Sequence, residues 1–177
     1  MAYYIKYKGE FLGRDGTAWQ VELLEEADAP FGEAGTLTFE ADEPLLLEWE
    51  ERGKEETVQG CMATLRLESP GDRTYEGLYS VEPCRVRMDV RREGLLYWQG
   101  TLDTEFYEEP YERASLYPVS LKFSDFGVLG RLKYDLAGMQ DLQAILDYCL
   151  RRAGLELATD QTLISTSFPG DSAPLRL

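Results

Sequence analysis

The sequence predicts a mainly β protein with a small α part: an antiparallel β-barrel or split barrel followed by a C-terminal amphipathic helix. Three observations predict this class. Apolar and polar residues alternate in short runs between residues 3 and 123. Turn signals rich in Gly, Pro and Asp separate the runs. After residue 124 the apolar spacing changes to the 3.6-residue period of a helix.

The first part of the chain contains short alternating runs. Strands are expected there at residues 3–7, 19–23, 37–40, 45–49 and 62–67. The turn at 13–16 separates the first two, and residues 27–35 form a loop because they carry Pro30, Gly32 and Gly35.

The next part begins with a change of pattern. Residues 72–79 start with an acid and predict a single helical turn. Residues 84–90 and 95–102 predict a hairpin around Gly94. An irregular crossing at 107–111 follows, and residues 117–123 predict the last strand.

Two helices are expected after residue 124. Ser124 and Asp125 provide an N-cap for a short helix that carries Leu129 and Leu132. The second helix ends at Gly154. Its apolar stripe consists of Leu142, Ile145, Leu146, Cys149, Leu150 and Ala153. We therefore expect a β-rich domain at 1–124, a helical segment packed on it at 125–157, and a linker or arm at 158–177.

Charge and composition exclude several classes of function. The chain of 177 residues has 33 acidic and 18 basic residues, a net charge of −15 and a pI near 4.4. Tight binding to nucleic acid or to anionic lipid needs a cationic surface, so neither is expected. The chain contains no histidine, which excludes Ser-His-Asp triads and His-ligated metals.

The cysteines and the first residues indicate where the protein is made. Cys61, Cys84 and Cys149 are widely spaced and odd in number, which is typical of buried free thiols in a reducing compartment. Residues 1–6 lack the apolar core of a signal peptide, and no apolar run approaches the length of a membrane span. We expect a soluble protein, cytoplasmic when synthesised.

Candidate catalytic and metal sites are sparse. Asp103 lies two residues before Glu105 and close to Glu108, and a glycosidase needs two such carboxylates. Among 33 acids such pairs arise by chance, and a solvated face explains them better. Asp42 and Glu43 offer at most a weak oxygen-ligated cation site. No phosphate-binding glycine motif occurs. We expect no enzyme activity, no cofactor and no metal.

The aromatic residues leave a binding function open. A sugar-stacking platform could include Trp49, Tyr97, Trp98, Phe106, Tyr107 and Tyr111. Aromatic residues favour strands in any case, so core packing is the simpler interpretation. A carbohydrate-binding β module that serves adsorption to a host surface is the alternative function.

A series of blocks resembles a known family. They are LLLEW at 45–49, QGCMATLRL at 59–67, DRTYEGLY at 72–79, LYWQGTLD at 96–103, YEEPY at 107–111, VSL at 119–121 and SDFGVL at 124–129. In this order they resemble the β region of bacteriophage tail hub or baseplate-type proteins from prophages. Cys61 stands where the family commonly has a small residue, and Asp125-Phe126 where it has Asp-Gly. Family members are also much longer.

The resemblance implies a structural virion component without catalytic residues. Its hub-like barrel domains would form a ring at the tail tip and contact copies of themselves and neighbouring tail proteins. The interface residues expected on this basis are Trp98, Tyr107, Pro110 and Tyr111. Within the hairpin, Tyr97 and Trp98 should point to opposite faces, and Gly100 should let the backbone bend beside them.

Overall fold

The structure is a computed structural model of residues 1–177. It describes residues 2–49, 60–71, 73–82, 84–106 and 116–125, together with residues 144, 145, 148, 149 and 151. The predicted segments 125–157 and 158–177 lie almost entirely outside the described residues and stay predictions. The five described residues between 144 and 151 have helical backbone.

The described chain is mainly β, as predicted. It contains β1 (Ala2–Leu12), β2 (Ala18–Ala27), β3 (Gly35–Thr36), β4 (Leu45–Trp49), β5 (Cys61–Ser69), β6 (Val86–Arg92), β7 (Leu95–Leu102) and β8 (Tyr117–Ser124). Two short 3-10 helices, η1 (Glu76–Leu78) and η2 (Thr104–Phe106), lie between strands. The helical turn expected at 72–79 is therefore confirmed by η1. No helix in the described part of the chain is long and apolar enough to cross a membrane.

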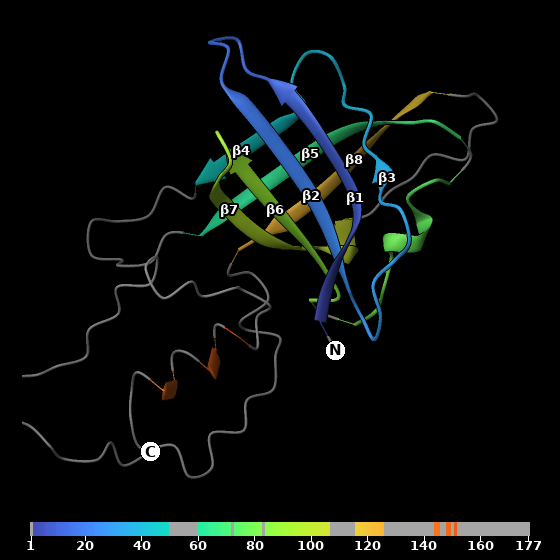
Figure 1. The fold of residues 1–177 in the computed structure, drawn as a ribbon, viewed down its shortest axis with the longest axis vertical. Coiled ribbons are helices and arrows are strands. Elements are labelled where there is room, and N and C mark those ends of the chain that lie inside the picture. The colour runs from blue at the N-terminus through green and yellow to red at the C-terminus, as the bar shows by residue number, and fades with distance from the viewer. Residues whose placement is uncertain are drawn as a thin grey trace, which may run out of the picture.

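The strands form one mixed sheet that folds over on itself. Its order is β3-β1-β2-β6-β7-β8-β5-β4, and the pairing is antiparallel except between β1 and β3. Figure 1 shows β1, β2 and β6 crossing in front of β5 and β8, so that the two halves make two layers. β7 and β8 pair through only Thr101↔Ser124 and Leu102↔Phe123, which makes this the corner between the layers.

The core fills the space between these layers. Every second residue of β5 and β8 points inward, because side chains in a strand alternate between its faces. The opposite layer contributes Val21, Leu23, Met88 and Val90, all fully buried. Each such side chain stabilises the fold by about 1.5–3 kcal/mol.

The sheet does not close into the predicted barrel. β3 and β4 are the two ends of the strand order, and no described pairing joins them to each other. Instead the chain after β3 crosses from one layer to the other. The Leu37 amide donates to the Lys8 carbonyl at 2.8 Å, and the Glu68 amide donates to the Thr38 carbonyl at 2.8 Å. We call residues 37–40 the seam. The predicted strand at 37–40 is thus reduced to a single bridge, Phe39↔Leu67.

Pro44 explains why the seam replaces a longer strand. The Arg66 amide donates to the Pro44 carbonyl at 2.9 Å, but proline has no N–H to return to the Arg66 carbonyl. The Glu40 amide takes this place at 3.2 Å. Arg66 also pairs through its side chain with Glu43. The loop from 40 to 44 is therefore fastened to β5 at one residue, and the strand ladder is interrupted there.

The hairpin predicted around Gly94 is confirmed. Glu93 and Gly94 have φ values of 50° and 78°, the paired positive angles of a tight hairpin turn. β6 begins at Val86 instead of residue 84, because Cys84 has a φ of 65° and interrupts extended backbone. The hairpin fixes the positions of the polar residues described below.

Candidate functional site

A hollow of about 960 Å³ lies on the outer face of the sheet, over β1, β2 and β6. Cross-strand register brings two rows of side chains to its floor: Ile5–Leu24–Arg87 and Lys8–Glu22–Asp89. The loop after β2 adds Phe31 to the wall, and Arg151 also lines the hollow. Its surface therefore combines apolar and charged groups.

A buried ion pair forms the centre of this floor. The side chains of Arg87 and Asp89 are only 6% and 3% exposed. They lie on the same face because they are two residues apart in a strand. The Arg87 guanidinium approaches the carboxylate at 2.8 Å through Nε and 3.1 Å through its terminal nitrogen. Gln99 of β7 donates a third contact to Asp89 at 3.1 Å. The pair is thus internally neutral and held from two strands.

Burial changes the protonation chemistry at this centre. It raises the pKa of the Asp89 carboxyl above its ordinary value of 3.8, although Arg87 and Gln99 lower it. Burial also raises the pKa of the Tyr3 phenol well above its ordinary value of 10, and the Cys84 thiol adds to this shift. The Tyr3 ring lies 4.6 Å from the Arg87 guanidinium, and its hydroxyl donates to the Cys84 carbonyl. Tyr3 therefore covers the pair.

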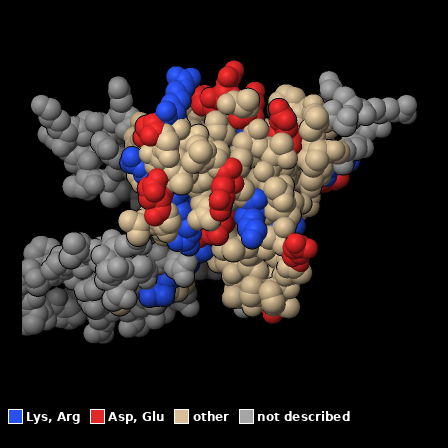
Figure 2. Space-filling model, turned by 45° about the horizontal axis from the view of Figure 1, so that its top comes forward, with Lys and Arg blue, Asp and Glu red and all other residues tan. Residues whose placement is uncertain are grey.

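The hollow carries an excess of positive charge on an acidic protein. Four basic residues line it, against the acids Glu22 and Asp89. Asp89 is neutralised by Arg87, and Glu22 lies 3.4 Å from Arg91. The remaining two cations, Lys8 and Arg151, have no ion-pair partner within the described part of the chain. Figure 2 shows acidic and basic side chains interspersed over the face in view, with no single-sign patch covering it.

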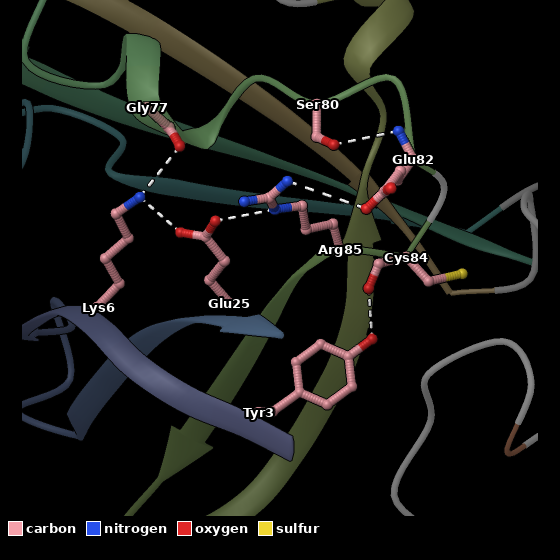
Figure 3. Close-up of polar contacts among 8 residues, drawn as sticks. All are labelled: Tyr3, Lys6, Glu25, Gly77, Ser80, Glu82, Cys84 and Arg85. Atoms are coloured by element: carbon pink, nitrogen blue, oxygen red, sulfur yellow. Dashed lines mark hydrogen bonds and ion pairs between the residues drawn. The ribbon is translucent and has the colours of Figure 1, made fainter. Parts of the chain in front are cut away.

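A second ionic cluster fastens η1 to the sheet, as Figure 3 shows. The Glu25 side chain is 6% exposed and accepts from Lys6 Nζ at 2.5 Å and Arg85 Nε at 2.9 Å. Lys6 also donates to the Gly77 carbonyl at 3.0 Å. Arg85 lies 3.9 Å from Glu82. One carboxylate therefore joins β1, β2 and the segments on both sides of residue 80. We call Lys6, Glu25 and Arg85 the clamp.

Of the four expected interface residues, only Trp98 is among the described residues. Trp98 was expected at an interface, but it is only 7% exposed and belongs to the core, which corrects that expectation. A Cβ at Gly100 would lie 2.2 Å from the Trp98 ring, so the ring lies directly over this glycine. Tyr97 is 47% exposed, in line with the expected difference between the two residues. Tyr107, Pro110 and Tyr111 lie outside the described residues.

Trp98, one of the six aromatic residues of the possible sugar platform, is buried. Tyr97 instead meets the Trp19 ring edge-on at 5.3 Å between centroids. Trp49, at the end of β4, is 51% exposed. Of the platform residues whose side chains the structure describes, Trp98 lies in the core, whereas Tyr97 and Trp49 lie at the surface.

The carboxylate candidates have local roles. Asp103 accepts the backbone N–H of Glu105 at 3.2 Å, which caps η2. Glu43 pairs with Arg66, as described above. Among the described residues no group of three or more acids and cysteines could hold a metal ion. Glu108 lies outside the described residues.

The cysteines follow the expectation in part. None of the three cysteines, all described, is in a disulfide; Cys61 and Cys84 are buried, and Cys149 is partly exposed. Burial raises the pKa of the Cys61 thiol to about 11, with a further contribution from Asp125. Cys61 is thus a poor nucleophile near neutral pH.

Sequence reasoning missed the Arg87–Asp89 pair. One signal for it exists: Arg87 and Asp89 alternate with the apolar residues Val86, Met88 and Val90. This pattern is also that of a strand with one solvent-facing side, so it does not reveal that both faces are buried.

Comparisons with family models, curated proteins and solved structures find no match to this chain. The candidate function therefore depends on features of the structure itself and on the resemblance of the sequence blocks.

Proposed function

We propose that this chain is a non-catalytic structural subunit of a bacteriophage tail hub or baseplate. In this proposal it is made in the cytoplasm, assembles with copies of itself into a ring at the tail tip, and contacts neighbouring tail proteins in the virion. The observation that carries the proposal is the open edge of β4 in a sheet that does not close.

The register of β4 shows which of its backbone groups point away from β5. The Arg66 amide bonds the Pro44 carbonyl, so the pairs two residues further, Leu46↔Thr64 and Glu48↔Met62, are also hydrogen-bonded pairs. The N–H and C=O groups of Leu45, Leu47 and Trp49 then point away from β5. No described residue pairs with this edge.

The sequence of β4 does nothing to protect this edge. Natural sheets shield their edges with lysine, proline or a covering segment, because a free edge pairs with other chains. β4 is Leu-Leu-Leu-Glu-Trp, with one charge and no proline. Leu46 is partly exposed on the outer face, and Trp49 is 51% exposed. These features favour a strand that acquires a neighbour by assembly.

The residues of the resembling blocks also have structural roles. In the block at 96–103, Trp98 and Gly100 interlock in the core and Gln99 holds Asp89. Thr101 is buried at the corner with β8. The block thus specifies the hairpin and the corner of the sheet, which supports a role as a rigid building unit.

The test is self-association of the full chain. Light scattering over a concentration series should show a mass that rises with concentration, and negative-stain images should show closed rings. Leu46→Lys places a charge on the free edge and should reduce the association. Ser120→Lys is the matched control, since Ser120 is exposed on β8, which pairs with β5 along its length. A strict monomer at the highest concentration reached would overturn the proposal, as would equal effects of the two lysines.

A further inference from the structure

The excess of basic residues in the hollow calls for an anionic occupant. Four cations face two acids there, and both acids already have basic partners. The chain as a whole carries a charge of −15. The basic hollow therefore attracts carboxylates that other parts of the surface repel. Its volume of about 960 Å³ is large enough for several side chains.

An acidic loop of matching chemistry is present in the same chain. The loop from 40 to 43 carries Glu40, Asp42 and Glu43. Glu43 pairs with Arg66, whereas Glu40 and Asp42 have no ion-pair partner within the described residues. Asp42 is exposed. Because backbone bonds fasten the loop to Arg66, its carboxylates are displayed from a fixed position.

The loop lies outside the hollow of its own molecule. Lys8 and residues 2–5 of β1 line the hollow, whereas Glu40 and Asp42 line a separate pocket together with Leu12. Within the described residues, neither carboxylate forms an ion pair with Lys8 or Arg91. In this arrangement a contact between loop and hollow joins two copies.

We infer that Glu40 and Asp42 of one copy dock into the outer-face hollow of the next, where Lys8 and Arg151 receive their carboxylates. The two surfaces differ, so the contact is head-to-tail, and head-to-tail contacts generate rings or open filaments. The inference rests on the proposed function and names a surface that joins the subunits in addition to the β4 edge.

Charge reversal on each side tests the contact in the full chain. Lys8→Glu and Asp42→Lys should each lower the association constant about tenfold or more, because each places like charges opposite one another. An equimolar mixture of the two variants should regain association, since each reversed surface then meets its reversed partner. Arg92→Glu is the matched control: it is exposed on β6, next to Arg91, but does not line the hollow.

A synthetic peptide of residues 38–45 provides a second readout that does not require assembly. It should bind the full chain in calorimetry and compete with association. The same peptide with Glu40→Gln, Asp42→Asn and Glu43→Gln should do neither. Salt at 1 M, where the screening length is about 3 Å, should abolish binding.

The outcomes separate this inference from the proposed function. If the wild type associates but neither reversal weakens it, or if the mixture does not recover, the docking contact is wrong and the subunit role stands. If the wild type stays monomeric, the subunit role fails. In that case, absence of peptide binding overturns the docking contact as well, whereas binding of the acidic peptide alone retains the hollow as an acceptor of acidic segments.

Discussion

The clamp allows the contribution of one carboxylate to be measured. Glu25→Gln keeps the size and one acceptor oxygen of the side chain but removes its charge. A hydrogen bond to a charged group contributes about 1.5–3 kcal/mol when buried. The Lys6 side chain is only 23% exposed, so its bond to Glu25 should contribute nearly this full amount to the unfolding free energy. Arg85 is 44% exposed, so solvent screens its bond to Glu25 and limits that contribution to below about 1 kcal/mol.

Glutamine retains a neutral hydrogen bond, so the net loss should be about 2 kcal/mol. For a chain of this size that corresponds to a fall in Tm of about 4–8 °C. Urea unfolding followed by circular dichroism measures the free energy, and a thermal scan measures Tm.

A local readout separates the clamp from a general loss of stability. Lys6 bonds both Glu25 and the Gly77 carbonyl, so losing the charge on Glu25 should loosen η1. The amides of Leu78 and Tyr79, which bond Tyr75 and Glu76 within that turn, should exchange hydrogen faster in Glu25→Gln. Glu26→Gln is the control, because Glu26 is exposed beside it. Equal Tm values and exchange rates in the two variants would refute the reasoning.

Three further predictions follow from buried groups. Gly100→Ala should destabilise the fold by about 1–3 kcal/mol in a urea titration, because the new Cβ would lie 2.2 Å from the Trp98 ring. Gly32→Ala is the control and should be nearly neutral, because a Cβ there has nothing within 4 Å. Cys61, with a pKa of about 11, is roughly one part in a thousand thiolate at pH 8, so a thiol reagent should label it only after denaturation; rapid labelling of the native protein would contradict this. Because the pKa of Asp89 is raised in the folded state, the stability from this group is largest below its ordinary value of 3.8 and is lost as the pH rises through the folded value. The unfolding free energy of the wild type relative to Asp89→Asn should therefore fall as the pH rises from about 4, and a difference that grows with pH would show that the sign is wrong.

Local chemistry made part of the fold predictable from sequence. The hairpin around Gly94 depends on neighbouring residues, and its alternation and turn were readable in the chain. The seam could not be predicted from the sequence. It forms because Pro44 has no N–H to donate to the carbonyl of Arg66, which lies more than twenty residues away in the chain. The same proline explains why a predicted strand became a single bridge.

The candidate site was harder to predict for a similar reason. Two adjacent aromatic residues, Tyr97 and Trp98, fit either face of a strand, and the space over Gly100 decides which one enters the core. In the sequence, Arg87 and Asp89 alternate with apolar residues, which is the pattern of a strand with one solvent-facing side. Only the approach of Tyr3 and Gln99 from other strands shows that they are buried.

The seam also determines the order in which the chain can fold. The hairpins close over short loops, from Leu12 to Ala18 and from Arg92 to Leu95. β5 can pair early with β4, since Trp49 pairs with Cys61, but its other edge must wait for β8, in which the nearest partners, Ser69 and Tyr117, are 48 residues apart. Closing a longer loop costs more entropy and is slower. The seam bonds both halves, so it forms after them, and until then the apolar side of β5 stays open to other nascent chains.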